Sequence, residues 1–82
     1  QGGFQLYPNP GHDRVQLLLD QAWSGETTVK VMDLNGRTLK AMVMDPAAKR
    51  NVTLEMGHLP AGIYLVECQN GSQRQVQKFV LQ

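Results

Sequence analysis

Cysteine, aromatic side chains and excess charge are all scarce in this 82-residue chain, and each scarcity excludes a class of protein. Because Cys68 is the only cysteine, no disulfide can form within the chain, and stability must come from packing. Glu67 and Gln69 give Cys68 no basic neighbour, so we expect a buried small hydrophobe rather than a reactive thiol. A net charge of +1 provides neither a nucleic-acid footprint nor attraction to an anionic membrane. No apolar run approaches the roughly 18 residues of a transmembrane helix.

Turn signals at regular intervals separate short stretches in which apolar and polar residues alternate, a pattern that predicts an all-β domain. The expected strands cover residues 4–7, 14–20, 27–33, 37–45, 52–54, 62–69 and 72–81. Seven strands with hairpin turns at Asn35-Gly36 and Asn70-Gly71 are typical of an immunoglobulin-like antiparallel β-sandwich. No 3.6-residue apolar period persists beyond two turns, so no helix is expected.

The alternation also predicts which residues of the fourth strand face the core. Leu39, Ala41 and Val43 are expected to point inward. Three methionines would then share the opposite face: Met32, Met42 and Met44. If exposed, they would form a soft apolar contact patch; otherwise a second layer packs on them. The Asn35-Gly36 turn is expected to be type I′, which needs positive φ at both residues.

A sharp corner is expected where Leu59-Pro60-Ala61-Gly62 precedes Tyr64 and an apolar strand. Proline presets φ, and glycine accepts φ values that other residues avoid. The Tyr64 ring is expected to pack inward, with its hydroxyl bonded to backbone a few residues upstream. This arrangement is the tyrosine corner of immunoglobulin-like domains.

The remaining candidates for chemistry are few. Trp23, in the predicted loop 21–26, either caps the open end of the core or offers a platform for stacking sugars. Ser24 and Ser72 have no histidine or acid at the spacing of a nucleophilic triad. Zinc-ligand types occur at His12, Asp13 and His58, but their spacing matches no metal site. We therefore expect no enzymatic activity, no metal and no cofactor.

Four segments stand in order along the chain: Leu6-Tyr7-Pro8-Asn9-Pro10, Asp33-Leu34-Asn35-Gly36-Arg37, Leu59-Pro60-Ala61-Gly62-Ile63-Tyr64 and Lys78-Phe79-Val80. In this order, within a domain of this length, they resemble the C-terminal sorting domain of cargo proteins of the type IX (Por) secretion system of Bacteroidetes. The resemblance extends from Phe4 to Leu81. It implies that residues 4–82 form one sorting domain. The opening Gln1-Gly2-Gly3 is itself typical of a linker, so we expect residues 1–3 to be a linker remnant from a longer protein.

The resemblance also assigns motif residues by position. The opening motif, just after the usual cleavage region, maps onto Tyr7, Pro8, Asn9 and Pro10. The central D-x-x-G turn maps onto Asp33 and Gly36, and the corner onto Leu59, Gly62 and Tyr64. The terminal strand, on which recognition is thought to depend, maps onto Lys78, Phe79, Val80 and Leu81. Family members often end on a basic residue, whereas this chain ends on Leu81-Gln82.

What the family implies is transport without a reaction. Its passengers reach the periplasm through an N-terminal signal peptide, and the outer-membrane secretion machinery then recognises the C-terminal domain. A cell-surface sortase often removes that domain and attaches the passenger to the surface. The implied partners are therefore the type IX machinery, the sortase and an N-terminal passenger, with no nucleic acid. The implied destination is the outer membrane, the cell surface or the medium.

Two other functions stay open from the residues alone. The domain could be an accessory module of an extracellular enzyme that binds glycan through Trp23, or binds protein, or it could be a structural spacer. As a sorting signal it should lose export when residues 78–82 are removed, with the fold largely kept. Its last strand is an edge that a partner could extend by strand addition, or through which two copies could pair.

Overall fold

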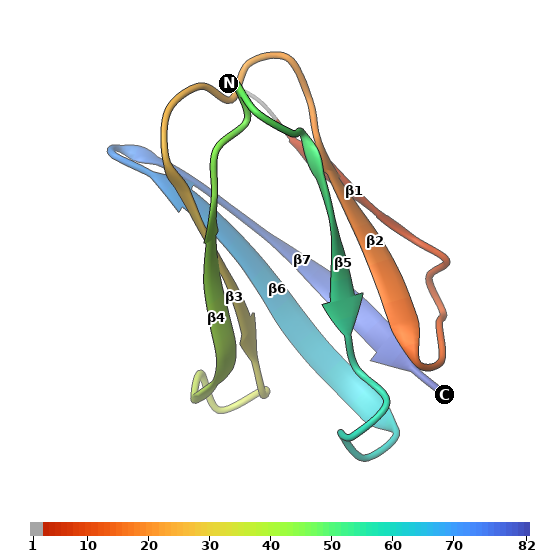
Figure 1. The fold of residues 1–82 in the computed structure, drawn as a ribbon. Coiled ribbons are helices and arrows are strands. Elements are labelled where there is room, and N and C mark those ends of the chain that lie inside the picture. Colours follow the sequence, from red (N-terminus) through yellow and green to blue (C-terminus); the bar gives the residue numbers. More distant parts are fainter. Residues whose placement is uncertain (1–2) are drawn as a thin grey trace.

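Alternating buried and exposed residues along seven strands build two antiparallel sheets that pack face to face (Figure 1). The computed structural model describes residues 3–82. The strands are β1 (Phe4–Tyr7), β2 (Arg14–Leu19), β3 (Thr27–Met32), β4 (Thr38–Met44), β5 (Asn51–Glu55), β6 (Gly62–Asn70) and β7 (Gln73–Leu81). One sheet has the order β1-β2-β5 and the other β4-β3-β6-β7. The predicted all-β sandwich is confirmed, and no helix among residues 3–82 could cross a membrane.

The core fills the space between the two sheets. Its largest fully buried apolar side chains are Trp23, Phe79, Leu17, Leu19, Leu54, Met56, Val15, Val29, Val31 and Val66. Cys68 is also fully buried, and burial raises the pKa of its thiol to about 12, with the nearby Glu67 charge adding to the effect. The expectation that Cys68 is a buried, unreactive hydrophobe is therefore confirmed.

Trp23 caps one end of this core. Its side chain is 0% exposed, and the indole Nε1 donates a hydrogen bond of 2.9 Å to the carbonyl oxygen of Gly3. The Arg50 guanidinium holds the same loop by donating to the carbonyl oxygens of Trp23 and Asp20. Because no face of the indole reaches solvent, the interpretation of Trp23 as a sugar-stacking platform is wrong.

A bulge in β4 changes which residues of that strand face inward. Val31 pairs with Lys40 but Met32 pairs with Thr38, so Leu39 is an extra residue. After this shift Val43 is 57% exposed and Met44 is only 8% exposed, while Leu39 packs against the core as predicted.

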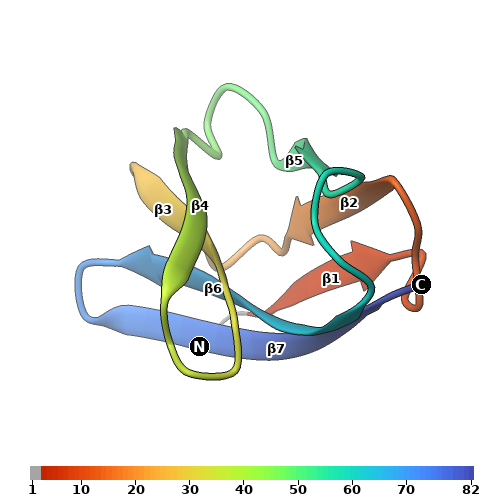
Figure 2. The same ribbon diagram turned by 90° about the horizontal axis from the view of Figure 1, so that it is seen from below.

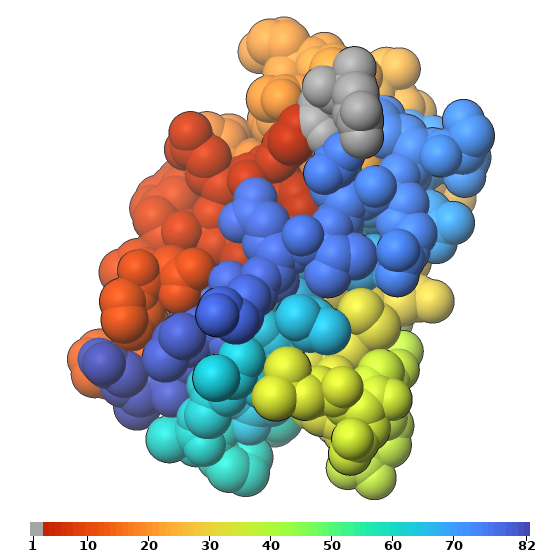
Figure 3. All heavy atoms as spheres, turned by 180° about the vertical axis from the view of Figure 1, so that it is seen from behind, coloured from red at the N-terminus to blue at the C-terminus, as the bar shows by residue number. Residues whose placement is uncertain are grey.

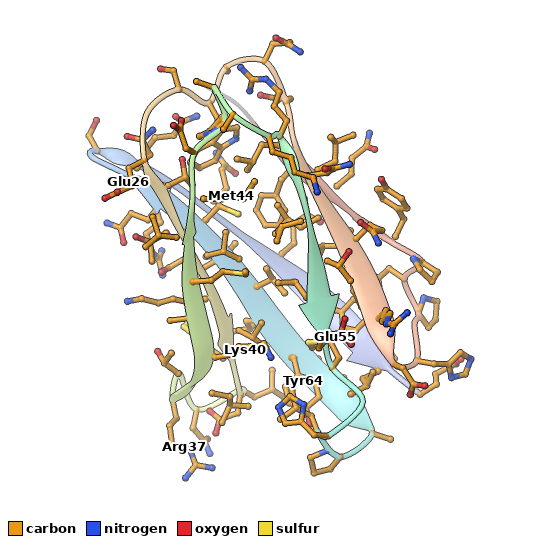
Figure 4. All side chains as sticks on the ribbon, in the orientation of Figure 1. Glu26, Arg37, Lys40, Met44, Glu55 and Tyr64 are labelled. Atoms are coloured by element: carbon orange, nitrogen blue, oxygen red, sulfur yellow. The ribbon has the colours of Figure 1, made fainter. Side chains whose placement is uncertain are left out.

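The inward positions predicted for Ala41 and Val43 are therefore wrong, and so is the exposed methionine patch. Met42 packs against the core, and Met32 and Met44 are buried. The bulge also turns Lys40 inward, where its Nζ donates to the carbonyl oxygen of Glu55 across the gap between β4 and β5 (Figure 4). An inward-pointing charge at a sheet edge opposes pairing with another chain.

Both hairpins form at the predicted places but with different turns. No described residue other than glycine has positive φ, so Asn35 does not, and the predicted type I′ turn is wrong. Instead Gly36 alone has φ 86° between the paired backbones of Asp33 and Arg37, as in a three-residue hairpin loop with a glycine bulge. At the second hairpin Gly71 and Ser72 are the central residues, with φ 57° at Gly71, which fits a type II′ turn.

The tyrosine corner is confirmed. The Tyr64 ring is 7% exposed, and its hydroxyl donates a hydrogen bond to the carbonyl oxygen of Pro60, four residues upstream. Figure 4 shows Tyr64 beside the turn that leads into β6. The bond ties the turn to the sheet, so β6 starts in a defined register.

Replacing Tyr64 with phenylalanine removes that hydrogen bond and keeps the packed ring. We expect Tyr64→Phe to lower the free energy of unfolding by about 1 kcal/mol, measured by urea denaturation. Tyr7, which is 43% exposed, supplies the matched control, and Tyr7→Phe should change little. Equal losses for the two variants would contradict a stabilising corner bond.

Candidate recognition site at the terminal strand

The terminal strand β7 forms one edge of the four-stranded sheet, and its side chains divide between two faces. Phe79 and Leu81 point inward and are 0% and 4% exposed. Lys78 and Val80 alternate with them and point outward. Of the four residues predicted for recognition, only these two present side chains that a partner protein could contact.

Along one of its edges, within the sheet, β7 pairs with β6, the strand that begins at the tyrosine corner. Gly62 is the partner of Leu81, and Tyr64 is the partner of Phe79. The corner residues and the terminal strand, which the sequence places apart, therefore form one hydrogen-bonded unit.

On its other side β7 is held by the opening motif. The Asn9 side chain donates from Nδ2 to the Lys78 carbonyl oxygen at 3.3 Å and accepts at Oδ1 from the Val80 amide at 3.2 Å. One side chain thus takes the place of a neighbouring strand. Figure 3 shows the orange residues of this motif against the dark blue end of β7.

Gly11 continues the contact in the manner of a parallel strand. Its amide donates to the Val80 carbonyl oxygen at 3.0 Å, and its carbonyl oxygen accepts from the Gln82 amide at 2.8 Å. A Cβ added at Gly11 would lie 2.8 Å from the Pro8 carbonyl oxygen and 2.9 Å from the Phe79 ring. Only glycine therefore lets the motif approach the strand so closely. Figure 2 shows the C-terminus beside the loop between β1 and β2.

This contact divides the outer edge of β7 into two parts. Near the C-terminus, the outward backbone groups of Val80 and the carbonyl of Lys78 are occupied by Asn9 and Gly11. The corresponding groups of Arg74 and Val76 have no such partner among residues 3–82. Strand addition is thus open along the first half of β7 and closed along the half that the motif predicts for recognition.

A hydrogen bond between the two sheets involves Gln77, a residue that the sequence analysis missed. Gln77 lies on the inward face of β7, and its side-chain amide donates to the Phe4 carbonyl oxygen on β1. The signal was present in the alternation, because Gln77 shares the parity of Phe79 and Leu81.

The core positions of Phe79 and Leu81 also change the expectation for truncation. Removing residues 78–82 would take both side chains out of the core together with the pairs to Gly62 and Tyr64. We therefore expect the truncated chain to lose the fold, contrary to the expectation from sequence, so that this deletion would not separate recognition from folding.

The D-x-x-G motif lies in the β3–β4 hairpin, away from this unit. No strand pairing or hydrogen bond among residues 3–82 joins it to β7. Asp33 Oδ1 accepts from the amides of Asn35 and Arg37, both at 2.9 Å. The hydrogen bond from the Arg37 amide, and after it the one from the Asn35 amide, hold the pKa of the Asp33 carboxyl below its usual value. The role of this motif visible here is to close the hairpin.

Residue Gly3 marks the other end of the described chain. Its amide donates to Asp20 Oδ2 at 2.7 Å, and this bond, with one from Ala22, lowers the pKa of the Asp20 carboxyl. Gln1 and Gly2 of the predicted linker lie outside the described residues. The linker boundary therefore stays a prediction.

Comparisons with known proteins agree on both sequence pattern and fold. Residues 5–82 match the sequence model of a family described as "Secretion system C-terminal sorting domain". Dimeric latent PorU from Porphyromonas gingivalis aligns with 98% of this chain at a TM-score of 0.75 and 14% identity. CopC from Methylosinus trichosporium OB3b aligns with 99% at a TM-score of 0.56 and 18% identity. At such identities these structures establish the fold alone.

The two structures differ in how much of them this fold represents. This chain corresponds to 9% of the PorU chain and to 91% of the CopC chain. The same sandwich thus occurs as a small part of a long protein and as nearly a whole one. No curated protein matches the sequence.

The Asn9 contact can be tested by hydrogen exchange. In Asn9→Ala the Val80 amide loses its acceptor, so its exchange should accelerate and the free energy of unfolding should fall by about 1 kcal/mol. Asn9→Asp keeps the acceptor for the Val80 amide but sets a second oxygen against the Lys78 carbonyl oxygen, so it should restore only part of the protection. Unchanged Val80 exchange in Asn9→Ala would show that Asn9 does not hold the strand.

The Asp33 carboxylate predicts a pH dependence of known sign. Its pKa is lowered in the folded state, so its contribution to stability is complete above the ordinary value of about 4 and is lost as pH falls through the folded value. Asp33→Asn should therefore be less stable than the parent at pH 7, and the difference should shrink toward pH 3. Urea midpoints at both pH values measure it; a constant difference would contradict a role for the charge.

Proposed function

The chain belongs to the family of secretion system C-terminal sorting domains and is a sorting signal of type IX secretion, and we propose that the outward face of its terminal strand is what the secretion machinery reads. The observation that carries this proposal is the position of Lys78 and Val80. Both point outward on an edge strand that is held in place from both sides. A signal read after folding needs such a rigid, accessible surface.

We propose that the other predicted residues act through shape. Asn9 positions the terminal strand, Tyr64 and Gly62 set the strand beside it, and Asp33 and Gly36 close the hairpin. Pro8 and Pro10 flank Asn9, and Leu59 packs against the core at the corner. On this proposal the motif residues serve to build a fold that presents β7, although they lie far apart in sequence.

As a type IX signal, the domain directs export across the outer membrane to the surface or the medium. We propose that the passenger precedes residue 4 and that a surface sortase cuts upstream of the sandwich. Phe4 begins β1 at the opposite end of the sandwich from the C-terminus (Figure 1). This separation would leave the cleavage region accessible while β7 is bound.

Domains of this family are generally non-catalytic, and we propose the same of this chain. Residues 3–82 hold no group of three or more histidine, cysteine, aspartate or glutamate side chains that could bind a metal.

The open backbone groups of Arg74 and Val76 are also where two copies would pair through an edge strand. The alternative of glycan binding rested on Trp23, which is buried and so cannot stack on a sugar.

An export assay tests this function. A fluorescent passenger with a signal peptide would be fused to the domain and expressed in a type IX-competent cell, and fluorescence outside the cells would be measured. The intact fusion should be exported. Combining Lys78→Glu with Val80→Thr should reduce the exported fraction by about tenfold, the effect of about 1.4 kcal/mol in binding.

Lys49→Glu, on an exposed loop, controls for charge reversal, and a thermal melt of each domain controls for folding. Retention of the intact fusion, in a cell that exports its own cargo, would contradict the sorting function. Equal export of the double variant would move recognition to another surface.

A further inference from the structure

The outer face of the four-stranded sheet is more apolar than that of the three-stranded sheet. On the three-stranded sheet the outward residues are mostly polar and bonded to each other. Gln16 donates to Thr53 Oγ1 at 2.9 Å, and Arg14 Nε lies 3.3 Å from Glu55 Oε1. Such a face is built to meet water.

On the outer face of the four-stranded sheet, apolar residues are as numerous as polar ones. Strand register places seven apolar residues on it: Met32, Ala41, Val43, Ile63, Leu65, Val76 and Val80. Adjacent strands bring Ile63 beside Val80, and Met32 beside Leu65. Val43, Ile63 and Val76 are 57%, 43% and 37% exposed, so most of the large apolar side chains exposed on this protein gather here.

The charges on this face are predominantly positive. Lys30, Arg74 and Lys78 point outward, and the one carboxylate among them, Glu67, is 5% exposed and paired with Arg74. Lys30 and Lys78 form no ion pair among residues 3–82, although Glu67 is the cross-strand partner of Lys30. They flank the apolar centre, with Lys30 on β3 and Lys78 on β7.

We propose that the outer face of the four-stranded sheet is the docking surface for a protein of the secretion machinery whose contact area has an apolar centre and carboxylates at its rim. This inference rests on the proposed function and extends it from β7 to the whole sheet. Charge complementarity selects the partner, because carboxylates would meet Lys30 and Lys78 while apolar groups cover Ile63. A second copy fits poorly, because two such faces would bring like charges together.

The test uses the fused passenger of the export assay with matched single substitutions. Ile63→Thr removes apolar surface from the proposed face, and Leu18→Thr does so on the outer face of the other sheet. Lys30→Gln removes one of the two cations, and Lys49→Gln removes a charge elsewhere. We expect Ile63→Thr and Lys30→Gln each to reduce the exported fraction by roughly three- to tenfold, and the two controls to keep it within about twofold.

A competition experiment separates docking from folding. Untagged intact domain, produced in the same cell, should lower export of the fusion, and untagged Ile63→Thr domain of equal melting temperature should not. Equal competition by the two domains, or full export of the Ile63→Thr fusion, would overturn the docking face and leave the sorting function standing. Retention of the intact fusion would instead contradict the sorting function itself.

The oligomeric state provides a further outcome. The purified domain should have the mass of a monomer by light scattering. A dimer that Ile63→Thr dissociates would assign this face to a second copy and overturn the proposal.

Discussion

The pairing of the terminal strand with both β6 and the opening motif is the constraint on which the rest of the structure depends. Register with β6 brings Phe79 and Leu81 into the core, and Asn9 and Gly11 hold the strand from its other side. Without these contacts the side chain of Phe79 would leave the centre of the sandwich. The last residues are thus part of the fold as well as of the proposed recognition surface.

That constraint explains how a short sequence can serve as a folded signal. Strand alternation turns Phe79 and Leu81 inward and leaves Lys78 and Val80 outside. A partner that contacts the terminal strand would therefore meet only every second residue of it, together with the outward residues of the neighbouring strands. A linear peptide of the same residues would present all of them equally.

The edges of the four-stranded sheet are protected from strand pairing, whereas its outer face is exposed. The bulge at Leu39 turns Lys40 inward at one edge, and Asn9 covers half of the other edge. Both devices oppose unspecific strand pairing. The outer face of the four-stranded sheet, in contrast, keeps apolar residues such as Ile63 exposed to solvent. The molecule therefore limits backbone hydrogen bonding to other chains at its sheet edges, and leaves the side chains of this outer face open to contact.

Local patterns determined much of this protein. Alternation, turn residues and the Leu59 to Tyr64 corner were enough to predict seven strands, their order along the chain and the tyrosine hydrogen bond, because each depends on residues close in sequence. Tertiary structure alone decided which residues of β4 face the core. One extra residue in the bulge shifts the alternation, and the position of this bulge cannot be read from the sequence. It also decided the burial of Trp23 and the contact of Asn9 with Lys78, across 69 residues of chain. Such contacts depend on how two sheets meet, and a pattern of period two carries no information about the partner across the interface.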